Sequence, residues 1–453
     1  MEQITLLIGV AIAVATLFVR PVYGLLLYLA TLAWYPSFLT VSVGTIDFTV
    51  RRIVILGILA KLILQPDAMR RFRIIRLDKG VIVLFAAQLV SGAFKATSLM
   101  ALLENRAGAV FDMVLPYFAV RILINTREQY VQLLKGVLVI AGPLAIAGLY
   151  ECVTGSNPLG FLRAYGTMES DGMSSVAARR FGLFRAAIGF SHSIMYGLFF
   201  AMLGPTCAGL LRSVRDKTVY GIGLALMAVG VLASVSSGPV LGALLALLFI
   251  LFFPWRRHWR VAVTVIVLMC ASVEIISNRH FYDVLGDFTF SSQTAWYRSR
   301  LISVALFEGG MSGHWLTGFG YGIDPGWGPQ IDGRLHTDTV NEYILMLHEF
   351  GLMALVPYLI MNIAAVRQLR RAYFASGLIA DRWLVWCISG ALTGLWITMM
   401  SVSLFGPPTS VFFMLLAFAG LLPGVLGEPA KARVNVARVR GRGEPTLQPS
   451  VSS

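Results

Sequence analysis

The stretch WLVWCISGALTGLWITMMSVSLFGPPTSVFFMLLAFAGLLPGVLG, from Trp383 to Gly427, contains no charged residue. It is about twice as long as the roughly 20 helical residues that cross the hydrocarbon core of a bilayer. The sequence FGPP at Phe405–Pro408 interrupts it near the middle, and glycine and proline are the residues that end helices. The stretch therefore predicts two membrane helices joined by a tight turn.

The same pattern recurs earlier, in the uncharged run Val219–Pro254 with its break SSGP at Ser236–Pro239. Of the 453 residues, 57% are hydrophobic and only 13% are charged. A soluble domain carries about 25% charged residues. These features predict an all-α polytopic membrane protein.

The apolar segments predict about 12–14 transmembrane helices in a single membrane domain, residues 1–427. The first segment follows Glu2 rather than basic residues, so it is expected to stay as a span and not to be removed as a signal peptide. The tail at 428–453 is basic, and is predicted to be disordered and cytoplasmic. Thirteen spans are expected near 4–19, 22–38, 51–65, 79–97, 107–124, 131–150, 188–211, 219–235, 238–254, 261–277, 338–366, 384–403 and 409–427.

Several connections between these segments carry clusters of cations, and all of these connections fall on one side of the membrane. The positive-inside rule places such clusters in the cytoplasm, so the net charge of +14 indicates membrane topology rather than nucleic-acid binding. Two long loops, about 151–187 and 278–335, fall on the opposite side, which in a bacterium is the periplasmic face of the inner membrane. The clusters are RRFRIIR (70–76), RSVRDK (212–217), RRHWR (256–260), RQLRR (367–371) and the tail.

The second long loop leads into GFGYGIDPGWGPQIDGRLHTDTVNEY, Gly318–Tyr343. Glycine at this density lets the backbone lie close to a ligand. Three side chains near its end are candidate catalytic bases. His336 lies at the junction of loop and helix, where solvent and ligand reach it. Asp338 and Glu342 are four residues apart, and are expected to share one face of a helix that starts near 338, capped by one of the threonines beside Asp338.

The two long loops also carry a set of arginines, whose planar guanidinium groups suit bidentate binding of phosphate. For any single arginine, pairing with a loop carboxylate is the simpler interpretation. The whole set on the translocated side, where cations oppose the topology signal, favours anion binding. The arginines are Arg163, Arg179, Arg180 and Arg185 in the first loop and Arg298, Arg300 and Arg334 in the second.

Several common catalytic patterns are absent from the sequence. There is no D-x-D metal site, H-E-x-x-H, G-x-S-x-G, Walker A motif or cysteine–histidine cluster. We therefore expect neither a metal nor a cofactor.

Three blocks of the chain, between about residues 80 and 427, resemble the O-antigen ligase and polymerase superfamily of bacterial polysaccharide assembly. RRFGLFRAAIGFSHSIMYGLFFAML (Arg179–Leu203) is similar to the family's arginine-containing entry into a central span. SVSSGPVLGALLALLFILF (Ser234–Phe252) is similar to its serine-arginine-glycine hairpin. The third block (Trp296–Met361) resembles its arginine helix, its Gly-x-Gly-x-Gly turn and its Asn-x-Tyr-Leu…Glu-x-Gly-Leu helix.

The resemblance implies a GT-C-like, membrane-embedded glycosyltransferase that needs no metal or nucleotide. The donor would be an oligosaccharide on polyprenyl diphosphate and the acceptor a sugar hydroxyl, with the lipid bilayer and other polysaccharide-assembly proteins as further partners and no nucleic acid. By position, Arg180 and Arg298 would bind the diphosphate, with Arg300 as an alternate. The full set of expected substrate-binding residues is Arg180, Arg298, Arg300, Arg334 and Asn341.

Two positions depart from the family pattern. Val340 stands where the family has a histidine directly before the asparagine, so His336, Asp338 or Glu342 would act as the base. Ser237 stands where the hairpin usually has arginine, which favours an exopolysaccharide or O-antigen polymerase over an O-antigen ligase acting on lipid A core. A lipid-linked oligosaccharide flippase is the alternative outside the enzymes, and it would need more charged residues within the spans than this chain has.

Overall fold

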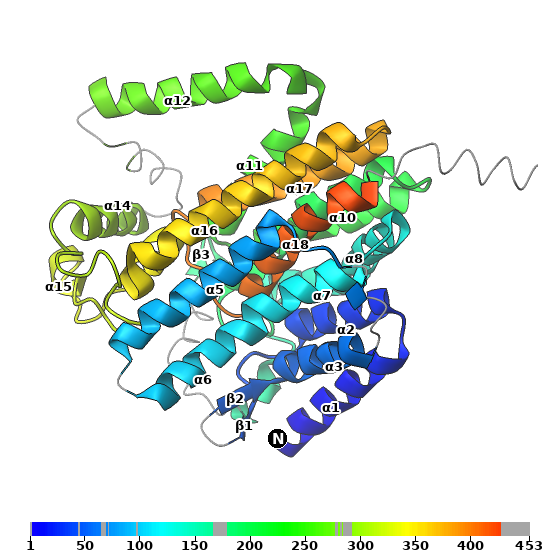
Figure 1. Ribbon diagram of the computed structural model, residues 1–453, viewed down its shortest axis with the longest axis horizontal. Helices are drawn as coiled ribbons and strands as arrows, with labels where there is room; N and C mark the ends of the chain where they lie inside the picture. The colour runs from blue at the N-terminus through cyan, green and yellow to red at the C-terminus, as the bar shows by residue number, and fades with distance from the viewer. Residues whose placement is uncertain are drawn as a thin grey trace, which may run out of the picture.

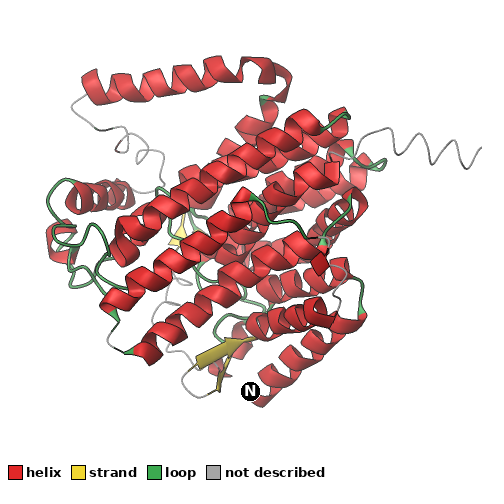
Figure 2. Ribbon diagram, viewed as in Figure 1, coloured by secondary structure: helices red, strands yellow, loops and turns green. Residues whose placement is uncertain are grey.

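The computed structural model is built almost entirely of helices, which confirms the prediction of a mostly helical chain (Figure 2). It describes residues 2–43, 46–64, 69–70, 72–96, 98–165, 179–276, 280, 283 and 292–426. The predicted tail and parts of both long loops therefore lie outside the described residues. The helices of the first half are α1 (Glu2–Phe18), α2 (Pro21–Trp34), α3 (Val50–Leu64), α5 (Arg76–Lys95), α6 (Leu99–Ala109), η1 (Val110–Val114), α7 (Leu115–Leu123), α8 (Arg127–Thr154) and η2 (Gly160–Tyr165).

The second half of the chain continues this pattern. All thirteen predicted apolar segments coincide with helices, and the fifth falls on α6, η1 and α7, which follow one another through one π-helical turn. The helices of the second half are α9 (Ser193–Cys207), η4 (Ala208–Arg212), α10 (Lys217–Ala233), α11 (Ser237–Leu251), η5 (Phe253–His258), α12 (Trp259–Ile276), α14 (Ser292–Leu306), α15 (Gly328–Ile331), α16 (Glu342–Ala375), α17 (Ile379–Thr398) and α18 (Pro407–Leu426).

Within the described residues, six helical stretches are long and apolar enough to cross a membrane. This composition makes the chain a multi-pass membrane protein. The six are Arg76–Lys95, Arg127–Thr154, Ser193–Arg212, Phe253–Ile276, Glu342–Ala375 and Pro407–Leu426, and shorter apolar helices are Glu2–Phe18, Pro21–Trp34, Lys217–Ala233 and Ser237–Leu251.

The core of the bundle surrounds α18, whose side chains are buried along nearly its whole length. Helices α5 and α16 lie side by side and antiparallel (Figure 1). By contrast, α12 runs apart from the bundle, and none of its residues is buried. An apolar helix that no protein covers is suited to contact with lipid.

Two short antiparallel hairpins are present in the described chain, β1 (Thr40–Val43) with β2 (Ile46–Thr49), and β3 (Arg179–Arg180) with β4 (Leu183–Phe184). The turn of the second is made by Phe181 and Gly182, with φ of 54° and 78°. Two successive positive φ angles are those of a type I′ turn, whose twist matches that of the strands. The turn fixes the place of Arg180 in the hairpin.

The bundle has two chemically distinct ends. We call the end that holds α14, α15 and the start of α16 the α14 end, and it also receives the β3–β4 hairpin (Figure 1). At the opposite end, α5 begins and α16 finishes, and the cation cluster 367–371 lies there together with Arg73 and Arg76 of the cluster 70–76.

Helix α16 is broken at Gly351, where φ is 66° and ψ is −168°. The break frees backbone groups that a glycine-rich loop, residues 307–341, satisfies. The amide of Leu352 donates to the carbonyl of Trp315 at 2.8 Å, and the amide of Phe319 donates to the carbonyl of His348 at 2.7 Å. Irregular backbone at such a place needs protein partners, because lipid offers none.

We expect Gly351→Ala to destabilise the protein by on the order of 3 kcal/mol, because its Cβ would lie 2.2 Å from the carbonyl oxygen of Leu316 and the backbone itself would have to move. Gly326→Ala is the matched control, since Gly326 has a φ of 73° but nothing within 4 Å of an added Cβ. We expect it to cost only about 1 kcal/mol. Thermal unfolding in detergent measures both, and equal losses would contradict the close packing at Gly351.

The start of α16 differs from the prediction. The helix begins at Glu342 and is capped by Asn341, whose side chain accepts the amides of Tyr343 and Ile344. The predicted start near 338 with a threonine cap was wrong, because Asn341 caps the helix and the backbone of Asp338 is bound to Tyr297 of α14. Asp338 consequently lies in the loop and does not share a helix face with Glu342.

Candidate functional site

Arg185 is held at the α14 end by a buried segment that follows the β3–β4 hairpin. One carboxylate oxygen of buried Glu151 accepts the amides of both Ala187 and Ile188, at 2.8 Å each. Arg185 itself is 8% exposed, and its Nη2 donates to Oγ of Ser236 at 3.0 Å. The segment 185–188 is therefore fixed by hydrogen bonds before any ligand arrives.

Two β-branched residues beside this arginine have left-handed backbone. Ile188 has a φ of 50°, and Val235, directly before Ser236, has a φ of 43°. This conformation is strongly disfavoured for β-branched side chains, and strain of this kind costs about 1–3 kcal/mol per residue. Strained residues gather at binding and catalytic sites, where the surrounding structure holds them in place. Their position here marks the hairpin at Ser236 and the segment after Arg185 as one site.

Arg298 lies on α14, whose inner face packs Leu301, Val304 and Ala305 into a small core with α15 and α16. The residue is 8% exposed. Its Nε and Nη1 atoms are buried and have no hydrogen-bond partner within the part of the chain that the structure describes. Buried guanidinium nitrogens without partners are rare and call for a ligand or water.

Arg180, Arg185 and Arg298 form what we call the arginine cluster. Burial lowers the pKa of both Arg185 and Arg298 to about 10, and the charge of Arg180 lowers each further in the same direction. Arg185 and Arg298 therefore remain protonated at neutral pH. Among the described residues, none of the three forms an ion pair within 4.0 Å. Within the described chain, the cluster is thus a concentration of positive charge in which no arginine is ion-paired, and Asp338 is an acid whose charge reaches Arg298.

His192 is a further member of the site that the sequence did not single out. It precedes α9, and its Nδ1 accepts the amide of Ile194 at 3.0 Å, which leaves the ring proton on Nε2. Burial lowers the pKa of His192 to about 4, and the charges of Arg185 and Arg180 act in the same direction. The neutral ring is therefore a hydrogen-bond donor. A histidine placed directly before an apolar span was the signal available in the sequence.

Asp338 is the acid nearest to the arginine cluster among the predicted bases. Its backbone is fixed to α14, since the hydroxyl of Tyr297 accepts the amide of Asp338 at 2.8 Å and donates to its carbonyl at 3.0 Å. Although the residue is exposed at the surface, neighbouring protein desolvates the carboxyl and raises its pKa, against the opposing charges of Arg334 and Arg298. A carboxylate in this position can accept a proton.

His336 and Arg334 lie on the outer surface of the glycine-rich loop. The His336 side chain is 91% exposed, and its Nδ1 lies 3.2 Å from Oδ2 of Asp324. Arg334 forms an ion pair with Asp332 at 3.1 Å. Burial would raise the pKa of Asp324, but the amides of Gly326 and Thr337 lower it to about 2. The structure does not bring His336 to the arginine cluster.

The remaining predicted site residues have partners that hold the fold together. Oε2 of buried Glu342 accepts the amide of Leu404 at 2.7 Å. Nδ2 of Asn341 donates to the carbonyl of Met400 at 2.7 Å, while its oxygen caps α16. Arg300 pairs with Glu308 on the loop after α14. The contacts of Glu342 and Asn341 join the start of α16 to the α17–α18 connection.

Arg106 on α6 fastens the glycine-rich loop to the bundle. Its guanidinium lies 4.8 Å from the ring centre of Tyr321 and 4.7 Å from that of Phe350. It is also close enough for its charge to act on Glu349. This cation–π contact closes one side of the loop over the break in α16.

Among the described residues, no three His, Cys, Asp or Glu side chains lie together as a metal site. A scan against protein-family models finds no match to this chain, and a search of curated proteins finds none. Its function has to be argued from the arginine cluster and the residues around it.

Proposed function

We propose that this protein is a membrane-embedded, metal-independent glycosyltransferase that transfers a polyprenyl-diphosphate-linked oligosaccharide to a sugar hydroxyl, acting as an exopolysaccharide or O-antigen polymerase. The observation that carries the proposal is the arginine cluster. Removing the partner of a buried charge costs about 3–5 kcal/mol, so unpaired buried guanidinium groups favour a ligand that supplies the missing negative charge. The diphosphate of such a donor carries two negative charges, and cleavage of its bond to the sugar adds negative charge to the leaving group, which a third arginine can match.

In the proposed reaction, the arginine cluster stabilises the leaving group. The acceptor oxygen forms a bond to the anomeric carbon as the bond between that carbon and the diphosphate oxygen breaks. The electron pair leaves with the polyprenyl diphosphate, where Arg180, Arg185 and Arg298 stabilise the developing charge. The Nε2 proton of His192 donates a hydrogen bond to the same group.

Asp338 accepts the proton of the acceptor hydroxyl in this scheme. Its exposed position at the edge of the site lets an incoming sugar approach, whereas Glu342 is buried and already accepts an amide. His336 forms its contact with Asp324, on the outside of the loop. Asp338 is accordingly the base we favour among the three candidates.

The orientation in the membrane follows from the two ends of the bundle. The thirteen predicted spans alternate in direction, so that the arginine cluster and the cation clusters 70–76 and 367–371 fall at opposite ends. The positive-inside rule then places the α14 end outside the cytoplasm. In a bacterium this end faces the periplasm from the inner membrane, where the two long loops would hold the glycan.

The family resemblance supports the same assignment at one particular residue. The hairpin at Ser234–Ser237 lacks the arginine that many members of the O-antigen ligase and polymerase superfamily carry there. The guanidinium of Arg185 reaches this hairpin and binds Ser236. A cation is therefore present at the hairpin, supplied by a different segment of the chain.

Binding of the leaving group tests the proposal directly. We expect polyprenyl diphosphate to raise the melting temperature of the purified protein, while polyprenol of the same length leaves it unchanged, because only ligands that bind the folded state stabilise it. Arg180→Gln should remove the difference between the two lipids. Equal shifts with diphosphate and alcohol would overturn the role of the arginine cluster.

Arg334→Ala provides a test through pH. Transfer requires the carboxylate form of Asp338, so the rate should fall as the pH drops through the pKa of that carboxyl. Desolvation by neighbouring protein raises this pKa, and the charge of Arg334 lowers it. Removing Arg334 should therefore move the acidic limb of the kcat/KM profile to higher pH, and Arg300→Ala, which removes a cation paired with Glu308, should leave it in place. An unchanged limb in Arg334→Ala would exclude Asp338 as the base.

A further inference from the structure

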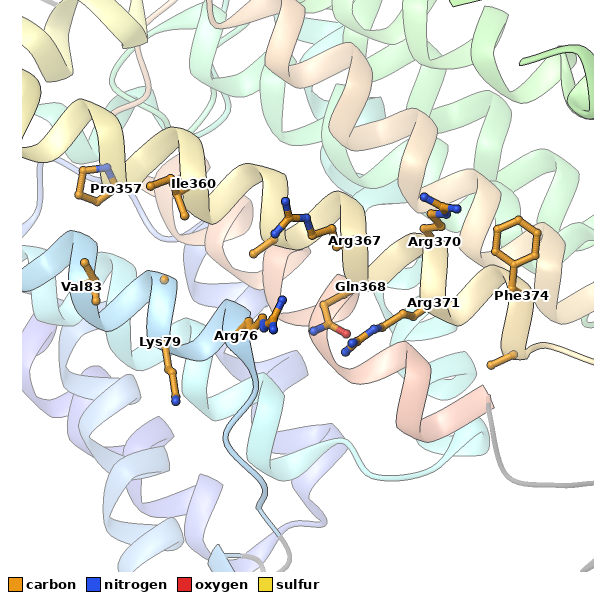
Figure 3. Close-up of a pocket in the computed structure, with 13 residues that line it drawn as sticks. Arg76, Lys79, Val83, Pro357, Ile360, Arg367, Gln368, Arg370, Arg371 and Phe374 are labelled. Atoms are coloured by element: carbon orange, nitrogen blue, oxygen red, sulfur yellow. The ribbon is translucent and has the colours of Figure 1, made fainter. Parts of the chain in front are cut away.

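A groove of about 940 Å³ lies between α5 and α16 at the end of the bundle opposite the arginine cluster. Its two halves differ in chemistry. One half is lined by Val83, Pro357, Ile360 and Ala364. The other is lined by five cations and a buried amide, and in Figure 3 several of these side chains gather where the two helices meet. The polar residues are Arg76, Lys79, Arg367, Gln368, Arg370 and Arg371.

Among the residues that the structure describes, the five cations have no acidic partner. Within the described part of the chain, none of them forms an ion pair, and all five side chains are exposed. The nearest acid in sequence, Asp78, is buried and bound to Arg121 at 2.9 Å and to the hydroxyl of Tyr117 at 2.7 Å. The groove therefore holds an uncompensated positive charge, and like charges so close together favour binding of an anion.

The two halves together have the dimensions of one lipid leaflet. Ile360 and Arg371 are eleven residues apart on α16, which corresponds to about 16 Å at the rise of a helix. Half of a bilayer's hydrocarbon core is about 15 Å. The cations consequently lie at headgroup depth when the apolar half lies beside the acyl chains.

We propose that this groove binds one anionic phospholipid of the leaflet at this end of the bundle. An acyl chain lies along Val83, Pro357 and Ile360, and the phosphate lies among Arg76, Arg367 and Arg371. The site is separate from the arginine cluster, which lies at the other end of α16. It stands whether or not the chain transfers glycans.

Charge complementarity and shape select this occupant over two others. The chain's own tail, 428–453, carries five Lys or Arg and two Glu, so its charge has the same sign as the groove. A free phosphate would leave the apolar half unfilled. An anionic diacyl lipid satisfies both halves, and such headgroups gain about 1 kcal/mol for each nearby cation.

Native mass spectrometry of the full-length protein in detergent tests the proposal, with phosphatidylglycerol and phosphatidylcholine as the probes. We expect wild-type protein to retain phosphatidylglycerol in preference to phosphatidylcholine. Arg367→Gln with Arg371→Gln should weaken phosphatidylglycerol binding on the order of 30-fold, from about 1 kcal/mol for each cation. The matched control is Arg257→Gln with Arg260→Gln, which removes two exposed cations near the same end but outside the groove.

Three outcomes would overturn the proposal. The first is equal retention of the two lipids by wild-type protein. The second is an equal loss of phosphatidylglycerol binding in the groove variant and in its control. The third is full displacement of phosphatidylglycerol by millimolar glycerol phosphate. If the double variant fails to fold, Ile360→Trp, which fills the apolar half from an exposed position, gives an independent test. Undiminished phosphatidylglycerol retention in that variant would also contradict the proposed site.

Discussion

We expect Arg298→Met to lower the rate of glycan transfer strongly and, at the same time, to raise the thermal stability of the ligand-free protein. Loss of one group that stabilises a developing charge lowers kcat by about 10²–10³-fold. The same substitution removes a buried cation without a partner and replaces it with an apolar side chain of similar length. Such replacements stabilise a fold by about 1–4 kcal/mol.

Arg300→Met is the matched control, because Arg300 lies two residues away on α14 and pairs with Glu308. We expect transfer within a few-fold of wild type and no increase in melting temperature. Turnover of a lipid-linked donor and thermal unfolding of the same preparations measure the two effects. Near-normal transfer by Arg298→Met, or a lower melting temperature, would remove the arginine cluster from the proposed mechanism.

Asp338→Asn is expected to reduce transfer by about 10²–10⁴-fold, the usual contribution of a general base. His336→Ala should remain within a few-fold of wild type, since the His336 side chain projects into solvent and contacts Asp324. Both residues lie in the glycine-rich loop, so each variant controls for disturbance of that loop by the other. The opposite ranking of the two activities would make His336 the base.

The helices were predictable because their cause is local. A run without charge, such as 383–427, has few stable states other than membrane helices, and FGPP marks where the hairpin turns. The β3–β4 turn also has a local cause, because Gly182 permits the second of its two positive φ angles. The misplaced start of α16 shows the limit, because Asp338 lies close to this helix in sequence but is held by Tyr297 on α14, 41 positions away.

For the site, the sequence predicted which residue types take part but not which of them lie together. The arginines were visible as cations on the translocated side, but their grouping depends on contacts between segments far apart in the chain. Arg185 contacts Ser236, which is 51 positions away in the sequence. Arg106 contacts Tyr321, which lies in the other half of the chain. The sequence makes Glu342 a candidate base, but its buried carboxylate accepts the amide of Leu404, a contact that spacing along the chain does not predict. Sequence spacing carries no signal for such contacts.

The most direct test of the proposed function uses purified protein in lipid vesicles with a polyprenyl-diphosphate oligosaccharide, alone and with lipid A core added. Glycan length on a gel and release of polyprenyl diphosphate are both measured. We expect a ladder of repeats and release of the diphosphate from the donor alone. A product that forms only with lipid A core would indicate a ligase, and an intact donor under both conditions would contradict a glycosyltransferase.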